Sequence, residues 1–293
     1  MELQRHETRD VRSSPTKIWQ PVRPEVGGKL SDVRQQLHHA AQFGAAAGIS
    51  YLEPEPDDAH ISLEWVPSLS GLFSRVVPAR TMFRVGVTPA DLSLVIVTEN
   101  DQLFAQYRLH GRTITEALEW IRFNIAVLGA DPMRYTLTRH YVIPRHDVAI
   151  GEAFDGSDKP HLEELERWLA NGALMLNSIA RPIPHAGEVR CSPHHLDISM
   201  RMQATRERTI GVGLEPGDDY YDEPYFYVSM TPQPASAQAR SRPLWGRGTW
   251  HTLEWVGAVL PGSRLNSAST QERQVREFID SAVSASRGLA LQD

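Results

Sequence analysis

The chain's only cysteine lies in a short stretch that also carries two adjacent histidines and an aspartate. In VRCSPHHLDISMRM, residues 189–202, Cys191 is followed by His194, His195 and then Asp197. Alternate residues of a strand share a face, so His195 and Asp197 are predicted to lie together on a polar face, with the apolar residues turned to the core. A carboxylate can orient an imidazole as a general base. His195 and Asp197 are therefore the candidate catalytic pair, and a solvated strand face is the alternative.

A metal site is another use of the same pair. His195, Asp197 and the more distant His251 resemble the two-histidine, one-carboxylate set of non-haem iron enzymes. The alternation of TWHTLEWV, however, turns His251 toward the core. We therefore predict no metal and no other cofactor, and the chain has no glycine-rich nucleotide-binding motif. Cys191 is expected to be a small buried residue rather than a reactive thiol.

A tyrosine-rich segment is the second candidate. DDYYDEPYFYV packs four tyrosines, a phenylalanine and four acids into eleven residues. Aromatic rings with hydroxyls suit a pocket wall, and a loop that covers a sheet edge is the alternative. Glu223, Tyr225 and Tyr227 of this segment are candidate ligand-binding residues. His60 and Glu64 join them, because they lie on the polar side of an alternating strand.

Composition limits the class of protein. The chain has 293 residues, 41% of them hydrophobic, and a formal charge of -6. Clustered positive charge is absent, which argues against nucleic acid or an anionic membrane as the main partner. A single cysteine excludes an internal disulfide and thiolate metal clusters. Without an apolar leader or a run of about 18 apolar residues, the protein is expected to be cytoplasmic.

Helices are predicted where apolar residues recur at helical spacing, from Leu30 to about Gly44 or Gly48, and again over residues 161–180. Two further helices are predicted after capping boxes. These are formed by Thr113 with Glu116 and by Ser269 with Glu272. Alternating or short apolar segments predict strands, which include AHISLEWV, TMFRVGV, LSLVIVT and QLFAQYRL in the first half of the chain.

The order of these elements predicts an α+β protein of two similar halves, each with a helix, antiparallel strands and a helix. Residues 1–28 are expected to be a tail or an arm, and the halves to span 29–145 and 158–288, as one compact domain or two. RTMFRVGVTPAD and RTIGVGLEPGD match at an offset of 127, and HISLEW and HLDISM match in character at 135. Internal duplication is the hypothesis, and chance convergence is the alternative.

Four blocks of the chain resemble a family of uncharacterised bacterial proteins known only as a domain of unknown function. The resemblance covers roughly residues 30 to 285. The family has a Leu-His-x-x-x-Gln helix, a Gly-Leu-x-x-x-x-x-Pro block before an Arg-Thr-Phe strand, a Cys-Ser-Pro-x-His signature and a Glu-Pro-x-Phe-Tyr block. The matching residues are Leu37, His38, Gln42, Gly71, Leu72, Pro78, Arg80, Thr81, Cys191, Ser192, Pro193, His195, Glu223, Pro224, Phe226 and Tyr227.

The resemblance implies a shared fold but no known reaction. It adds His38 and Gln42 to the candidate ligand-binding residues. The chain departs from the family at GAAAGISY and HISLEW, where the family has a Gly-Lys pair and tryptophans. It also has Leu-Asp-Ile-Ser after His195, where the family has Phe-Phe-Trp-Gly. A pocket shared with the family would therefore be remodelled here.

Together these patterns favour a protein with a small-molecule pocket on the polar sheet face, which works as an acid–base enzyme through the His195–Asp197 pair or only binds. The alternatives are a metal-dependent enzyme and a non-catalytic interaction or scaffold protein, whose aromatic residues would form a homodimer or partner surface.

Overall fold

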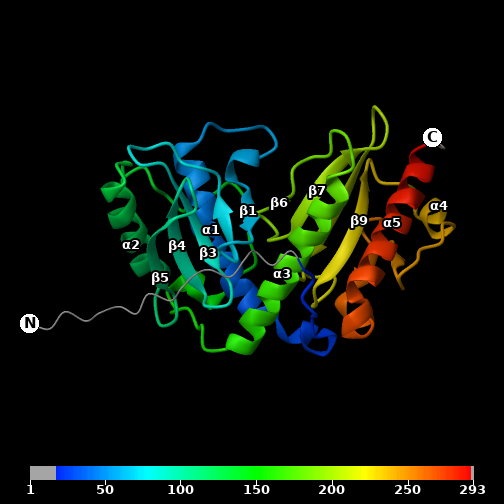
Figure 1. Ribbon diagram of the computed structural model, residues 1–293, viewed down its shortest axis with the longest axis horizontal. Helices are drawn as coiled ribbons and strands as arrows, with labels where there is room; N and C mark the ends of the chain where they lie inside the picture. The colour runs from blue at the N-terminus through cyan, green and yellow to red at the C-terminus, as the bar shows by residue number, and fades with distance from the viewer. Residues whose placement is uncertain (1–17, 292–293) are drawn as a thin grey trace, which may run out of the picture.

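Every strand of the described chain joins one antiparallel sheet. The computed structural model describes residues 18–291. Its eleven strands lie in the order β10-β11-β9-β8-β7-β6-β1-β2-β3-β4-β5 (Figure 1). The strands are β1 Leu63–Val66, β2 Gly71–Ser74, β3 Phe83–Thr88, β4 Ser93–Thr98, β5 Leu103–Arg108, β6 Arg190–Cys191, β7 Ile198–Gln203, β8 Thr209–Glu215, β9 Tyr225–Thr231, β10 Thr249–His251 and β11 Gly257–Pro261. With the helices, this sheet confirms the predicted α+β class.

The long helices pack on a single face of this sheet. They are α1 Ser31–Tyr51, α2 Ile114–Val127, α3 Lys159–Ala180 and α5 Gln271–Ala290, and the short α4 spans Ser236–Arg240. Leu63 lies against Gly44 of α1, and Leu214 lies against Gly172 of α3. The strand register connects Leu63 to Leu214 through Cys191 and Ile198, so the two leucines point to the same face.

The two halves of the sheet meet at β1 and β6, where Leu63 pairs with Cys191. One hydrophobic core runs through this junction and contains residues of all four long helices. Cys191 is fully buried within it, as predicted, and burial raises the pKa of its thiol well above the ordinary value. The sheet also twists, so that α1 lies behind the strands in Figure 1 whereas α3 crosses in front of them.

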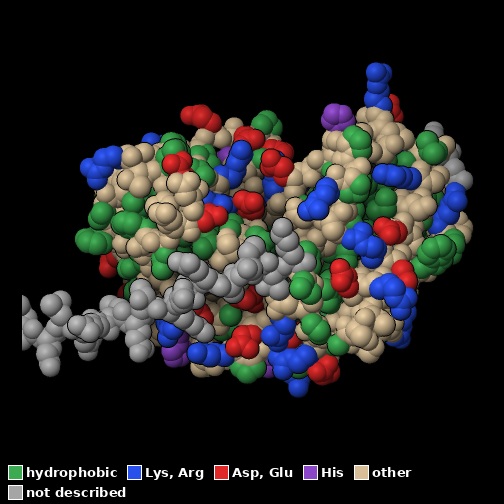
Figure 2. All heavy atoms as spheres, in the orientation of Figure 1, with side chains coloured by type: hydrophobic (Ala, Val, Ile, Leu, Met, Phe, Trp, Pro, Cys, Tyr) green, Lys and Arg blue, Asp and Glu red, His purple; other side chains and the backbone are tan. Residues whose placement is uncertain are grey.

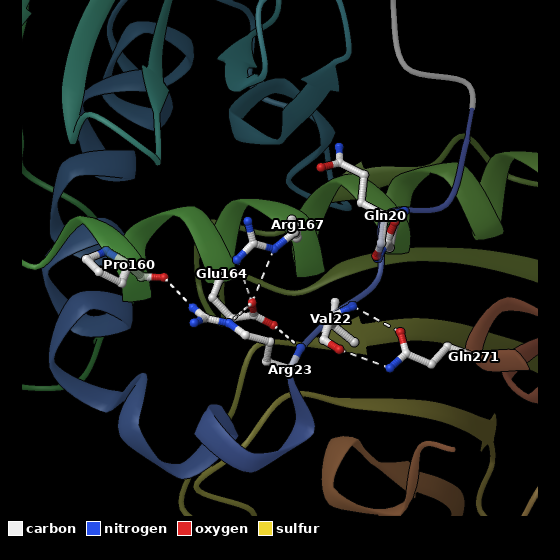
Figure 3. Close-up of polar contacts among 8 residues, drawn as sticks. Gln20, Val22, Arg23, Pro160, Glu164, Arg167 and Gln271 are labelled. Atoms are coloured by element: carbon white, nitrogen blue, oxygen red, sulfur yellow. Dashed lines mark hydrogen bonds and ion pairs between the residues drawn. The ribbon is translucent and has the colours of Figure 1, made fainter. Parts of the chain in front are cut away.

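An N-terminal arm, residues 18–23, crosses α3 and reaches α5 (Figure 3). The side-chain amide of Gln271 accepts from the Val22 N–H and donates to the Val22 carbonyl, both at 3.0 Å. Asn171 makes the same pair of bonds with the backbone of Gln20, at 2.9 and 2.6 Å. Trp19 is buried and stacks on Phe226. Of the predicted tail, residues 1–17 lie outside the described chain, and residues 18–28 are part of the packed structure.

Most predicted elements are present, and the differences are local. The capping box of Thr113 and Glu116 forms at the start of α2. The one predicted for Ser269 and Glu272 does not, because α5 begins after Thr270, whose side chain makes no cap hydrogen bond. The strand predicted from AHISLEWV begins only at Leu63, because residues 59–61 form a 3-10 helix.

Each half begins and ends with a long helix and has its strands between them, but in the second half the short α4 also lies between β9 and β10. The segments that match at an offset of 127 contain β3 and β8, and each of these is the third strand of its half. The segments that match at 135 lead into β1 and β7, which are the first and the second strand of their halves. Only the offset of 127 therefore relates corresponding strands, and internal duplication stays a prediction.

Replacement of Gln271 by Met should loosen the arm. The side chain is buried, so its loss leaves the N–H and carbonyl of Val22 without partners. We expect the free energy of unfolding in urea to fall by about 2–3 kcal/mol and proteolysis within residues 18–23 to become faster. The exposed Gln102→Met is the control, with an expected change under about 0.5 kcal/mol. Equal stability of the two variants would show that the hydrogen bonds between Gln271 and Val22 do not stabilise the protein.

Candidate functional site

A polar depression lies on the helix-free face of the second half of the sheet. Ser199, Gly213 and Tyr227 lie opposite one another across β7, β8 and β9, and so do Arg201, Gly211 and Ser229. Except for Gly213, which the ring of Tyr227 covers, these residues form its floor. A Cβ on Gly213 would collide with the ring of Tyr227, so this glycine lets the ring lie flat on the strand. Small side chains on the floor therefore leave room above the sheet.

Walls from both halves of the protein turn this depression into a cleft of about 480 Å³. One wall is the loop of Asp57, Asp58 and Ser62 in the first half. The other walls are the segment 187–190 and the turn 192–195 in the second half. Figure 2 shows the opposite, helix-covered side of β7–β9. The volume lies within the range of small-molecule sites.

The same face of the first half is filled by apolar side chains. Val66, Phe73, Val95 and Val97 form a separate small cluster there, and all four are buried. The guanidinium of Arg84 lies over the ring of Phe73, 5.8 Å from its centre. This contrast, apolar packing in one half and small polar residues in the other, explains why the main cleft lies over β7, β8 and β9.

Asp197 lies at the inner end of the main cleft and is paired with a tyrosine. The Tyr227 hydroxyl donates to Asp197 Oδ2 at 2.6 Å. Burial and the nearby Asp197 raise the pKa of Tyr227 well above its ordinary value, so the phenol stays protonated. Burial, followed by the charges of Asp197 and Asp218, also raises the pKa of Glu215 well above its ordinary value. The main cleft thus contains the carboxyl of Asp197 with the Tyr227 hydroxyl as its hydrogen-bond donor, whereas Glu215 lies outside the lining.

His195 lines the main cleft but does not lie on the strand predicted to carry it. The strand β7 begins at Ile198, and Leu196 has a left-handed φ of 64°, which breaks the alternation between His195 and Asp197. The turn is closed by a bond from the Ser192 N–H to the Asp197 carbonyl at 2.9 Å. His195 is exposed at the rim, whereas Asp197 is buried and bonded to Tyr227.

The turn 192–195 is held from below by two side chains of α1. His38 Nε2 and Gln42 Nε2 both donate to the carbonyl of Pro193, at 2.9 and 3.0 Å. Gln42 in turn accepts from the hydroxyl of Tyr141 at 2.8 Å. Burial lowers the pKa of His38 to about 4, so its ring is neutral at pH 7 and donates through one nitrogen. His38 and Gln42 therefore support the wall of the cleft.

The remaining candidate ligand-binding residues lie outside the main cleft. His60 is buried and accepts from the Glu55 N–H at 3.1 Å. Glu64 forms an ion pair with Arg84 at 2.8 Å. Glu223 accepts from the hydroxyl of Ser263 at 2.8 Å.

Tyr225 is buried outside the lining of the cleft, and its hydroxyl donates to Asp218 Oδ2 at 2.7 Å. The tyrosine-rich segment thus contributes one ring to the cleft, that of Tyr227.

The three residues of the alternative metal site do not converge. His251 lies on β10, four strands from β7 in the sheet order, which corresponds to about 19 Å. It is buried, stacked on Trp255 at 4.5 Å and bonded to the carbonyl of Leu253 at 2.6 Å. His195, Asp197 and His251 therefore cannot bind one ion in this structure.

A different group of donors does converge. Ligand atoms of Asp58, His140 and His194 all lie within 4.8 Å of one another. The sequence reasoning missed this group because the residues come from three separate loops, and no spacing in the sequence connects them. Two of the three, Asp58 and His194, line the main cleft.

Comparison with known proteins identifies no relative. No family model matches the chain, and neither a curated protein nor a solved structure does. The resemblance to the uncharacterised bacterial family therefore stays a prediction. Within residues 18–291, none of the helices has the length and apolar character needed to cross a membrane.

His38 should make stability depend on pH. The unfolded chain binds a proton at this residue near pH 6.5, whereas the folded chain does so only near pH 4. Its contribution is thus complete above pH 6.5 and is lost as the pH falls toward 4, by up to about 3 kcal/mol. Urea unfolding at pH 7 and 4.5 should show a smaller loss in His38→Gln than in the wild type. The control is His161→Gln, at a partly exposed histidine, and an identical loss in all three proteins would refute this role.

Proposed function

We propose that the protein binds a small polar molecule in the main cleft between its two halves. The observation that carries the proposal is the floor of serine, glycine and threonine residues over β7, β8 and β9, enclosed by walls from both halves. Such side chains fill little space and offer hydroxyls and backbone groups for hydrogen bonds. The apolar cluster in the first half shows that the same sheet face can be closed when it serves packing alone.

The charges of the cleft favour a ligand with a carboxylate or phosphate group. Arg190 is already paired with Glu188 at 3.0 Å and with Asp57 at 3.4 Å. Arg201 is exposed at the floor, and among the described ion pairs none involves its guanidinium. A guanidinium binds an anionic group in a bidentate manner, so Arg201 would fix the orientation of the ligand.

Acid–base chemistry on this ligand would use Asp197 and His195. Both line the cleft, where Asp197 is fixed by Tyr227 and His195 is free to approach a ligand at the rim. Exposed aromatic residues such as Tyr220 and Trp245 lie outside the lining. A polar cleft supports ligand binding over the scaffold alternative, because protein interfaces have an apolar centre.

The proposal predicts that filling the floor abolishes ligand binding without unfolding the protein. A Cβ on Gly211 would meet only the rotatable hydroxyl of Ser229, so Gly211→Val should fold. A panel of small carboxylates and phosphate esters is screened against the metal-free wild type by thermal shift and calorimetry. We expect at least one compound to bind, with at least tenfold weaker binding to Gly211→Val and to Arg201→Gln.

The matched control is Gln106→Val, which places the same side chain on the helix-free face of β5 in the other half. It should bind the compound like the wild type. Equal binding to all variants would place the ligand elsewhere. Absence of any binding compound, in a panel that spans both anion types, would count against the cleft as an anion-binding site.

A further inference from the structure

We propose that Asp58, His140 and His194 bind one divalent transition-metal ion at the edge of the main cleft. His140 Nε2 lies 2.9 Å from Asp58 Oδ2, and His194 Nε2 lies 3.5 Å from the same oxygen. Ligands about 2.0–2.2 Å from one ion are about 3 to 3.5 Å apart in tetrahedral or octahedral geometry. The two separations from Asp58 match this spacing, and all three ligand atoms lie within 4.8 Å of one another.

The Nε2 of His194 gives a second argument, because its 3.5 Å contact with Asp58 is not a hydrogen bond. His194 Nε2 is buried, and it makes no hydrogen bond within the described residues. A buried polar atom without a partner is costly, so native structures rarely leave one. A metal ion between the three side chains would satisfy this nitrogen and would replace the direct contact between His140 and Asp58.

The histidine is also held in place by its surroundings. The ring of Tyr141 stacks on His194, with the ring centres 4.0 Å apart. Tyr141 is bonded to Gln42, which also holds the carbonyl of Pro193 next to His194. Support of this kind from outside the ligand set fixes the orientation of a metal-binding imidazole.

The backbone fixes the carboxylate as well. Asp58 has a left-handed φ of 56°, a conformation that aspartate tolerates, and its carbonyl accepts from the Ile61 N–H at 3.1 Å. The 3-10 helix that follows holds the loop against α1, where its His60 carbonyl lies over Gly48. The loop therefore presents the carboxylate from a defined position.

The donor set indicates the kind of ion. Two imidazoles with one carboxylate suit zinc or iron, whereas magnesium and calcium prefer oxygen ligands alone. Three protein ligands leave at least one coordination position for water or a bound molecule. Because Asp58 and His194 line the main cleft, that position is close to the proposed ligand. The metal site does not depend on the proposed function, since its three ligands are complete without a bound molecule.

The experiment is calorimetric titration of metal-stripped protein with Zn²⁺. We expect one Zn²⁺ per chain and at least tenfold weaker binding in His194→Ala and in Asp58→Asn. Asparagine keeps the left-handed turn, so Asp58→Asn tests the charge without disturbing the loop. Co²⁺ provides a second readout, because its visible absorption reports the ligands and should be lost in both variants.

The matched control is His161→Ala. His161 and Asp158 form a similar pair at 2.6 Å. Among the described residues, no third metal-binding side chain completes a group with this pair. This variant should bind Zn²⁺ like the wild type. Circular dichroism verifies that each variant is folded. Absence of Zn²⁺ binding to the wild type, or equal binding to Asp58→Asn and His194→Ala, would overturn the proposal and leave only an Asp58–His140 ion pair.

Loss of the metal site would not remove the proposed ligand site, because the compounds of the earlier screen are tested on metal-free protein. Conversely, a chain that binds Zn²⁺ but none of the compounds would retain the metal site and lose the proposed anion-binding function. The two failures are therefore distinguishable.

Discussion

The carbonyl of Pro193 connects the first helix to both candidate sites. His38 and Gln42 of α1 bind this one oxygen from the first half, while the turn that carries it belongs to the second half. Two donors on a carbonyl satisfy both of its lone pairs and fix its position. The turn therefore presents His194 and His195 at set places, and the two sites depend on contact between the halves.

The two faces of the sheet have different roles. Its junction at β1 and β6 is short, so most of the connection between the halves comes from the continuous core beneath it. The helix-covered face supplies stability over the whole length of the sheet. The opposite face is free to differ, and it is apolar over the first half and polar over the second. A binding site can arise on such a face without loss of the main core.

Local patterns were sufficient for the helices and most strands, because apolar periodicity directly reflects burial on one face. They failed where backbone geometry broke the period. The left-handed Leu196 separates His195 from Asp197, and the 3-10 helix at residues 59–61 removes His60 from its expected strand face. In both places polar and apolar residues alternate across a turn, and this pattern does not show where the strand begins.

The candidate sites were predictable only in part, for a different physical reason. Asp197 and Tyr227 are 30 residues apart, and each lies in a segment rich in polar or aromatic residues. The sequence therefore predicts each of them as a site residue, but not their contact. Asp58 and His140 are 82 residues apart, in loops with no distinctive pattern. Their proximity follows from how the loops pack, which local periodicity does not encode.

The contacts of the N-terminal arm constrain the order of folding during synthesis. Its Val22 is clamped by Gln271, which is 249 residues later in the chain. Because synthesis proceeds from the N-terminus, Trp19 and Val22 must stay undocked until Gln271 has been made. The arm thus leaves the ribosome well before its partner helix α5 and reaches its native contacts only after that helix has been made.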